Sequence, residues 1–295
     1  MAAGFESSGI FTLFSGKSSG PKPLGRFFVS IDMSRRRRFL VPLLMLAGLV
    51  LTLGARGAEP SKEVRKTIPF AEGGRVDVET YKGSVDVTAE ERPDVLVEAR
   101  VTPDTSCGDR KAQAEWVEKT EVRIESHGKT VRIESDYEAL SSFHPWFFGS
   151  CTARPFVDYK IRMPRKADLD VKDYKSKVTV AGLSGDLRIN SYKGTMNIRD
   201  LDGSIRLETY KGDASVALAK LRSDSRFETY KGEIEVSLPR TAAFEIDADA
   251  GRRGDFRSDF GVQTRSGRRM SATLNGGGPR LALSTYKGSL KLAAR

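Results

Sequence analysis

The sequence predicts an all-β fold, a β-solenoid built from coils of about 18 to 20 residues, and three observations lead to it. A short phrase ending in Tyr-Lys-Gly recurs along the chain, apolar residues alternate with polar ones on both sides of each copy, and neighbouring copies are almost evenly spaced. Internal repeats of this length are typical of folds in which similar units stack on one another.

The repeated phrase contains a tyrosine followed by a lysine in every copy. The tyrosines at positions 174, 192, 210 and 230 are 18, 18 and 20 residues apart, and two further copies lie far from this group. The twelve residues of this Tyr-Lys ladder are Tyr81, Lys82, Tyr174, Lys175, Tyr192, Lys193, Tyr210, Lys211, Tyr230, Lys231, Tyr286 and Lys287.

Each copy lies between two short strands. Around Tyr192, for example, Leu187 and Ile189 precede the phrase and Met196 and Ile198 follow it, with polar residues between them. Alternation with a period of two indicates a half-buried strand. The inward positions on the two sides are an odd number of residues apart, so the chain must bend at Tyr-Lys-Gly, where glycine permits the bend.

Two architectures satisfy this pattern. A meander of hairpins would place Lys-Gly in two-residue turns, whereas a solenoid would make each period one coil, stacked about 4.8 Å from the next. Stacking places equivalent positions of neighbouring coils in contact, which explains why the same tyrosine and lysine recur. We therefore expect the solenoid.

The N-terminal segment differs in composition from the rest. Residues 1–32 are expected to be an unstructured or untranslated leader, and residues 33–57 a signal peptide, because cationic Arg35–Arg38 precede an apolar run at 39–54. The run is shorter than the about 20 residues of a spanning helix. We expect export to the periplasm, cell surface or medium, and the alternative is an inner-membrane anchor formed by 39–54.

The net charge of +10 comes largely from this segment. Eight of the 49 Lys and Arg residues and only two of the 39 acidic residues precede position 58, so the remainder carries a net charge of +4. A nucleic-acid-binding domain is usually far more basic. We therefore expect no nucleic-acid partner, and a membrane contact only through the N-terminal segment if it is not cleaved.

Residues 70–295 are expected to form the solenoid domain, with an insertion at 102–155 near its N-terminal end. Around this insertion the pattern predicts a strand at 94–101, a helix at 109–119, a hairpin of 122–124 with 131–133, and a returning strand at 156–163. The insertion also holds the densest aromatic cluster, Phe143, Trp146, Phe147 and Phe148. Two interpretations fit: a plug that covers the end of the solenoid, and a loop that binds a sugar or a partner.

Cys107 and Cys151 are the only cysteines and flank the insertion. In an oxidising compartment a disulfide between them is the expected state, with two unpaired thiols as the alternative. The bond would stabilise the fold by about 3 to 4 kcal/mol in the chain-entropy model.

The repeat loosens after the coil that contains Tyr230. The pattern predicts one more strand at 244–248, a segment rich in glycine and arginine at 251–267, and a turn before the last coil. Arg253-Gly254-Asp255 has the form of an integrin-binding tripeptide, and a turn between short strands explains it as well.

The strand Val157–Pro164, the coils that follow each glycine, and the closing segment Leu274–Thr285 together resemble the bacterial putative-adhesin β-strand-repeat family, the DUF4097 group. The resemblance covers about residues 70–295. It implies an exported, right-handed β-solenoid and supplies no catalytic residues. The chain departs from the family pattern by using Tyr-Lys-Gly where Asn-Gly is frequent, and by its cysteine-flanked aromatic insertion.

The sequence contains few patterns typical of catalytic or metal-binding sites. His127 and His144 lack the spacing of metal ligands, and no glycine-rich phosphate loop follows a strand. Carboxylates such as Asp86, Glu208 and Glu235 alternate with apolar residues, as on a solvated strand face. We predict a protein that is not an enzyme, with no catalytic, cofactor-binding or metal-binding residues. The alternative is a β-helical enzyme acting on polysaccharide, which would need carboxylates and Arg or Lys together in a groove.

The Tyr-Lys ladder is the positive indication of function. Thr80, Ser191 and their equivalents share the inward parity, so the tyrosines should face outward with the lysines beside them. Stacked rings would stabilise neighbouring strands, whereas rings beside cations would suit an anionic polysaccharide or another envelope polymer. In-register lysines repel each other, and Glu79, Glu208 and Glu228 or an anionic partner would have to offset this.

We therefore expect an adhesin-like structural or binding protein of the cell envelope, whose partner is an anionic polysaccharide or another envelope protein. A membrane-anchored periplasmic scaffold or sensor is a further alternative.

Overall fold

The computed structural model describes residues 59–141, 153–262 and 269–295. The predicted leader and signal segments therefore lie outside the described residues, as do His144, the aromatic cluster Phe143 to Phe148 and Cys151. Within the described part no helix is both long and apolar enough to cross a membrane.

The described chain consists almost entirely of strands. In chain order the elements are β1 (Lys62–Pro69), β2 (Arg75–Glu90), β3 (Asp94–Thr102), α1 (Arg110–Lys119), β4 (Glu121–His127), β5 (Thr130–Asp136), α2 (Glu138–Ser141), β6 (Phe156–Pro164), β7 (Asp168–Ala181), β8 (Leu187–Gly203), β9 (Ile205–Leu221), β10 (Ser225–Leu238), β11 (Phe244–Asp249), β12 (Asp255–Ser258), β13 (Arg269–Leu274) and β14 (Arg280–Ala294).

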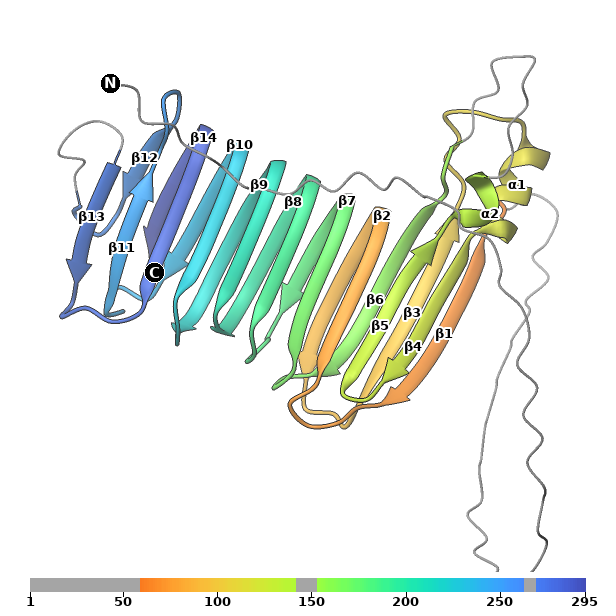
Figure 1. The fold of residues 1–295 in the computed structure, drawn as a ribbon, viewed down its shortest axis with the longest axis horizontal. Helices are drawn as coiled ribbons and strands as arrows, with labels where there is room; N and C mark the ends of the chain where they lie inside the picture. The colour runs from red at the N-terminus through yellow and green to blue at the C-terminus, as the bar shows by residue number, and fades with distance from the viewer. Residues whose placement is uncertain (1–58, 142–152, 263–268) are drawn as a thin grey trace, which may run out of the picture. The chain divides into compact units, whose positions relative to one another are not determined.

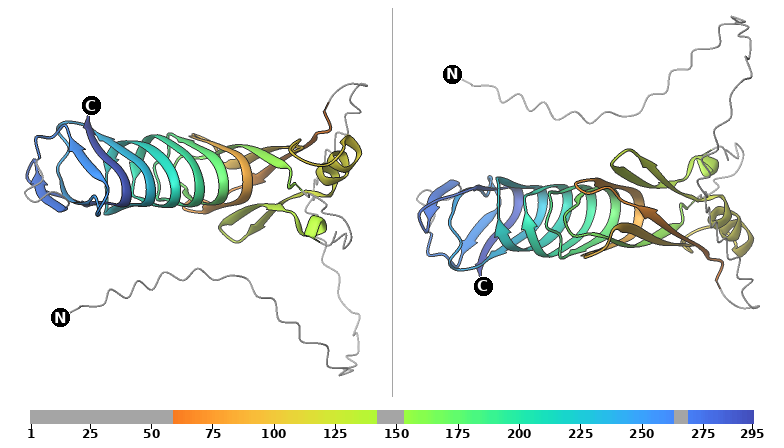
Figure 2. Two further views of the ribbon diagram at one scale, coloured as in Figure 1. Left: turned by 90° about the horizontal axis from the view of Figure 1, so that it is seen from above. Right: turned by 90° about the horizontal axis from the view of Figure 1, so that it is seen from below.

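Six long strands, β2, β7, β8, β9, β10 and β14, each form one coil of a β-solenoid. Each strand runs along one face, bends at the Tyr-Lys corner and returns along the other face (Figures 1 and 2). Neighbouring coils pair in parallel and in register, so that Lys175 faces Lys193 and Lys193 faces Lys211. Parallel pairing excludes the hairpin meander and confirms the predicted solenoid. Its right hand stays a prediction.

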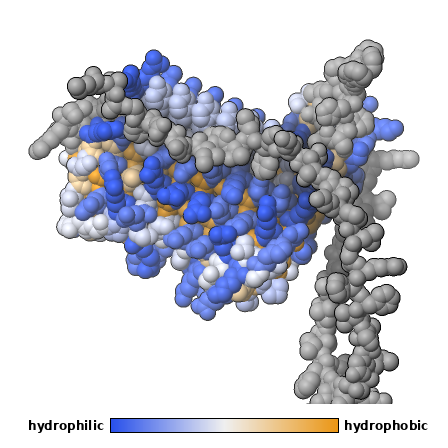
Figure 3. Space-filling view, viewed as in Figure 1, coloured by the Kyte–Doolittle hydropathy of each residue, from blue (hydrophilic) through white to orange (hydrophobic). Residues whose placement is uncertain are grey.

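The core lies between the two faces of the coils. Apolar residues at alternate positions, such as Ile189, Met196 and Ile198, are buried there, and polar residues point outward and cover much of the face seen in Figure 3. The close spacing of the coils also explains the corner glycine. A Cβ at Gly194 would lie 2.1 Å from the carbonyl oxygen of Ser176 in the next coil, so the position requires glycine because of stacking as well as bending.

The spatial order of the coils differs from their order in the chain. β14, the last strand, lies between β10 and the pair β11 and β12. β11 and β12 together form one further coil at the C-terminal end, and β13 pairs antiparallel with β11 beyond it (Figure 1). β2 likewise lies between β7 and the later strands β5 and β6. The six coils that carry the Tyr-Lys phrase are therefore contiguous in space although two insertions separate them in sequence.

The insertion completes the N-terminal end of this stack. β5 pairs with the first half of β2 and β6 with its second half, so the two strands together form an outer coil. Residues 137–155 lie between these two strands in the sequence. Antiparallel strands then extend the two faces separately: β3 and β1 beyond β6, and β4 beyond β5, which gives the forked end in Figure 2. The structure confirms the predicted hairpin and helix, the latter capped by Asp109, whose carboxylate accepts the Ala112 N–H at 2.8 Å. β1 was not predicted.

Candidate functional site

The six tyrosines of the repeated phrase form one continuous stack along a corner of the solenoid. Successive ring centroids are 4.7, 4.7, 5.1, 4.9 and 5.0 Å apart from Tyr81 to Tyr286, and the planes of neighbouring rings differ by 4° to 16°. Each ring within the stack therefore has both faces covered by its neighbours. The stack presents ring edges and phenol hydroxyls to solvent.

A row of hydroxyl-bearing side chains lies directly beneath the tyrosines. It is buried and consists of Thr80, Ser191, Thr209, Thr229 and Thr285. In the coil of β7 an aspartate, Asp173, takes this position between Thr80 and Ser191. Burial raises the pKa of Asp173 to about 6, although its carboxylate accepts a hydrogen bond from the backbone N–H of Ser176 at 2.9 Å.

The lysine after each tyrosine also lies in register with those of neighbouring coils. Five of the six side chains are exposed, and within the described part of the chain they form no ion pair: Lys175, Lys193, Lys211, Lys231 and Lys287. Two of the acidic residues considered as an offset for the lysine charges pair with arginines: Glu79 with Arg132 at 3.4 Å, and Glu228 with Arg226. These five residues are called the lysine row below.

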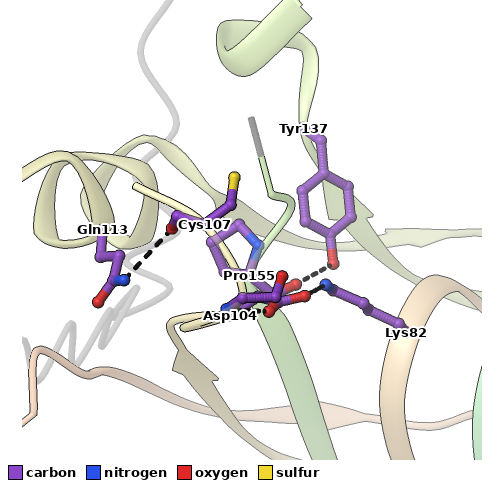
Figure 4. A network of polar contacts seen from close by, with 7 residues as sticks. Lys82, Asp104, Cys107, Gln113, Tyr137 and Pro155 are labelled. Atoms are coloured by element: carbon purple, nitrogen blue, oxygen red, sulfur yellow. Dashed lines mark hydrogen bonds and ion pairs between the residues drawn. The ribbon is translucent and has the colours of Figure 1, made fainter. Parts of the chain in front are cut away.

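Lys82 departs from the prediction that every ladder lysine faces solvent, because it is only 9% exposed. Its ammonium group pairs with Asp104 (Figure 4) and lies 4.3 Å from the centroid of the Phe156 ring. Burial raises the pKa of Asp104, but hydrogen bonds from Lys82 and Ser106 outweigh this effect and hold the pKa at about 2. The residues that cover Lys82 come from both ends of the insertion, so no local pattern around Lys82 could have revealed its burial.

The same insertion closes one end of the tyrosine stack. The guanidinium of Arg154 lies over the Tyr81 ring, 4.2 Å from its centroid, and Tyr137 contacts that ring edge-on at 6.1 Å. The Tyr137 hydroxyl donates to the carbonyl oxygen of Pro155 at 3.2 Å (Figure 4), and burial raises its pKa to about 12. Sequence reasoning missed Arg154, Tyr137 and Asp104, since none of them belongs to the repeat.

The other end of the stack is open among the described residues. Tyr286 is 48% exposed. The Tyr230 ring stacks on one of its faces, and no other aromatic ring or cation of the described residues stacks on it. Gly251, which has no side chain, lies beside its backbone in the outermost coil. A shallow pocket of about 470 Å³ adjoins this end, lined by Asp213, Gly232, Glu233, Arg253, Gly254, Asp255, Lys287, Gly288 and Ser289.

A second hollow, of about 560 Å³, crosses the starts of the strands from β2 to β14. Arg188, Arg206 and Arg226 lie in register along it, which the sequence analysis did not anticipate. Its carboxylates act as acceptors within the coils: Asp168 accepts the N–H of Asp186 at 2.9 Å, and Asp186 accepts the Ser204 hydroxyl at 2.6 Å.

The predicted disulfide stays a prediction. Cys107 lies between β3 and α1 and is not a free thiol, and Gln113 donates to its carbonyl oxygen at 3.3 Å (Figure 4). Its expected partner, Cys151, lies outside the described residues. The aromatic cluster Phe143, Trp146, Phe147 and Phe148 lies outside them as well, so neither interpretation of that loop is tested.

A family model described as Toastrack DUF4097 matches residues 67–293. Among solved structures, a putative cell adhesion protein from Clostridium sporogenes is 14% identical over 80% of this chain and 100% of its own, with a TM-score of 0.48. A putative adhesin from Bacteroides fragilis is 12% identical over 80% and 100%, with a TM-score of 0.28. A putative lipid binding protein from Parabacteroides distasonis is 12% identical over 79% and 97%, with a TM-score of 0.23. No curated protein matches the chain.

Proposed function

This chain belongs to the Toastrack DUF4097 family, and we propose that it is a non-catalytic, adhesin-like binding protein of the cell envelope whose lysine row recognises an anionic polysaccharide. The observation that carries the proposal is the set of five exposed lysines held in register along one edge, without ion pairs in the described part of the chain.

Like charges at this spacing oppose folding unless something offsets them. Two unit charges 4 Å apart interact by about 1 kcal/mol even in water. Glu79 and Glu228 pair with arginines rather than with these lysines. A partner that carries regularly spaced negative charges would therefore gain favourable electrostatic interactions with the lysine row. A linear anionic polymer lying along the edge fits this arrangement.

The stacked tyrosines define how such a polymer would be held. Because the ring faces within the stack are covered, sugar rings could not lie flat on them. Along the edge, the polymer would instead contact the lysine ammonium groups and the phenol hydroxyls, which can donate to carboxylate oxygens. The stack would then act chiefly as a rigid support that fixes the lysine spacing.

The test compares two variants of equal charge. The first changes all five residues of the lysine row to Gln, and the control changes five other exposed lysines: Lys111, Lys129, Lys160, Lys166 and Lys220. If each ladder lysine contributes about 0.3 kcal/mol or more, the first variant should bind acidic polysaccharides at least about tenfold more weakly. The control should lose much less, and wild-type binding should weaken with salt. Equal losses in the two variants would contradict the proposal.

Export to the envelope is part of the proposal and rests on the N-terminal sequence, Arg35–Arg38 followed by the apolar run 39–54. N-terminal sequencing of the protein recovered from its native cells would show cleavage near residue 57 if the segment is a signal peptide. An intact N-terminus in the membrane fraction would favour the anchored scaffold instead.

The hollow that crosses the starts of the strands supports a second candidate function, that of a β-helical enzyme acting on polysaccharide. It brings Arg206 and its neighbours together with Asp168 and Asp186, which is the combination that a β-helical enzyme acting on polysaccharide would need. Chain-length analysis of any polysaccharide that binds, after prolonged incubation with the protein, distinguishes the two functions. Shortened chains whose formation is abolished by Asp186→Asn would favour the enzyme.

A further inference from the structure

We propose that the open end of the tyrosine stack, at Tyr286, is a subsite for a single acidic sugar residue, whose ring lies on the outer face of the Tyr286 ring. The inference rests on the proposed binding of an anionic polysaccharide by the lysine row. It adds the chemical class of the polymer and the point at which one of its rings is held.

The opposite end of the stack shows how an end ring is completed in this protein. There the planar guanidinium of Arg154 lies over Tyr81, 4.2 Å from its centroid. Tyr286 has Tyr230 on one side at 5.0 Å, and no cation or ring covers its other side within the described residues. The next coil places Gly251 beside the Tyr286 backbone, so no side chain at that position fills the space above the ring.

A sugar ring suits such a face. The face of an aromatic ring carries partial negative charge, and the C–H bonds on one side of a pyranose ring are polarised by the neighbouring oxygens. Contacts of this kind need an uncovered aromatic face. Within the part of the chain that the structure describes, Tyr286 is the one of the six tyrosines that offers it, because the inner rings are stacked on both sides and Arg154 covers Tyr81.

The shallow pocket that begins at Lys287, the residue after Tyr286, supplies groups for both the acid and the hydroxyls of a sugar. Lys287 and Arg253 line it, and both are exposed; either could bind a carboxylate. Asp213, Glu233 and Asp255 line it as well. Asp255 pairs with Arg257 at 3.1 Å, and Asp213 accepts the backbone N–H of Glu233 at 2.9 Å, so their remaining lone pairs can accept sugar hydroxyls.

The three carboxylates decide between two kinds of anionic polymer. A chain of phosphates carries negative charge at every unit and no hydroxyl donors, so three nearby carboxylates would repel it. A polyuronate carries one carboxylate and several hydroxyls in each sugar residue, and it can satisfy the cations and the carboxylates of the pocket together. The pocket therefore favours an acidic polysaccharide over a phosphate polymer.

The test is calorimetric titration of the protein with two probes, oligogalacturonates of defined length and inorganic polyphosphate of matched charge. We expect Tyr286→Ser to weaken oligogalacturonate binding about tenfold and Tyr286→Phe, which keeps the ring, to leave it within about twofold. Polyphosphate binding should change by less than about twofold in both variants, because that polymer would depend chiefly on the lysine row and each variant removes only one phenol hydroxyl. Circular dichroism confirms that both variants are folded.

The outcomes separate this inference from the proposed function. Oligogalacturonate binding that is lost in the five-lysine variant but unchanged in Tyr286→Ser would overturn the subsite and leave the lysine row intact as the binding surface. Equal weakening by Tyr286→Ser and Tyr286→Phe would show that the ring face is not the contact and would also overturn it. If the wild-type protein binds neither probe, both proposals fail.

Discussion

The two ends of the tyrosine stack carry the same phrase, Thr-Tyr-Lys-Gly, at positions 80–83 and 285–288, yet their environments are opposite. At the first end, Arg154 covers Tyr81, and Lys82 is buried against Asp104 and Phe156. At the other end, the tyrosine and the lysine are both exposed. The repeat therefore determines the backbone and the stacking, whereas the segments outside the repeat determine which copies are accessible to a partner.

The difference follows from the segments that connect the two strands of each outermost coil. At the N-terminal end residues 137–155, which include Tyr137 and Arg154, lie between the two strands in the sequence. At the C-terminal end the connection is the short turn Ala250–Gly254, which places Gly251 next to the stack. Tyr137 and Arg154 contact the Tyr81 ring, whereas the short glycine turn leaves Tyr286 uncovered within the described residues. Four predictions test this contrast, in order of decreasing effect.

The largest effect is expected from Lys82→Met, which removes a charge at the closed end. The variant leaves the Asp104 carboxylate half-buried without its partner, so the free energy of unfolding at pH 7 should fall by about 2 to 3 kcal/mol. Because the folded-state pKa of Asp104 is about 2, below its ordinary value of 3.8, the ion pair stabilises the wild type above pH 4. This contribution is lost as pH falls toward 2.

Urea denaturation at several pH values measures both effects. In Lys82→Met the loss of stability between pH 4 and pH 2 should be smaller than in the wild type. The double variant Lys82→Met, Asp104→Asn should recover part of the loss at pH 7. If Lys82→Met is as stable as the wild type, the stability of the closed end does not depend on the pair of Lys82 and Asp104.

The two ends of the tyrosine stack also differ in the buried residues that lie beneath the rings. The buried row contains only threonine near the open end, whereas Asp173 interrupts it near the closed end. The folded-state pKa of Asp173, about 6, exceeds the ordinary value of 3.8, so between these values the folded protein holds a proton that the unfolded chain lacks. This group therefore makes the protein less stable as pH rises from 4 to 6, and the loss persists above pH 6.

Replacing the acid with the residue used in four of the other five coils, Asp173→Thr, should raise the free energy of unfolding at pH 7 by about 2 kcal/mol. The melting temperature should rise by about 4 to 8 °C. The variant should also lack the fall in stability between pH 4 and pH 6. Calorimetric scans across this range would contradict the assignment if the wild type and the variant showed parallel pH profiles.

Arg154→Ala removes the cover from Tyr81. Because Arg154 is exposed, its contact with the aromatic ring contributes about 0.5 to 1 kcal/mol, so the melting temperature should fall by about 1 to 4 °C. Arg154→Lys keeps the charge but not the planar group, so its melting temperature should lie between those of the wild type and Arg154→Ala. Stability unchanged in both variants would mean that closing the stack is energetically neutral.

The smallest effect is expected from Lys287→Met, the counterpart of the first substitution at the open end. Because this side chain is exposed and forms no ion pair with the described residues, stability should change by less than about 0.5 kcal/mol. Binding of oligogalacturonate should nevertheless weaken. A loss of stability comparable to that of Lys82→Met would remove the contrast between the two ends.

The alternation and the even spacing of the repeats were sufficient to predict the solenoid, because both signals are local. Burial of Ile189 and Met196 follows from the period of two, and the outward tyrosines follow from the parity at each corner. The helix capped by Asp109 and the hairpin of β4 and β5 were predictable for the same reason. The burial of Lys82 was not, since it depends on contacts with Asp104 and Phe156.

The coils, their corners and the residues that stack can thus be predicted from the sequence, because they depend on residues close together in the chain. Which coils are neighbours depends instead on contacts between distant parts of the folded chain. β14 takes the place beside β10 since Tyr286 can stack on Tyr230 and Thr285 can lie against Thr229, whereas the coil of β11 and β12 offers Gly251 at that level. Which end of the stack is covered also depends on the folded structure, because Arg154 lies over Tyr81 although the two residues are 73 positions apart in the sequence.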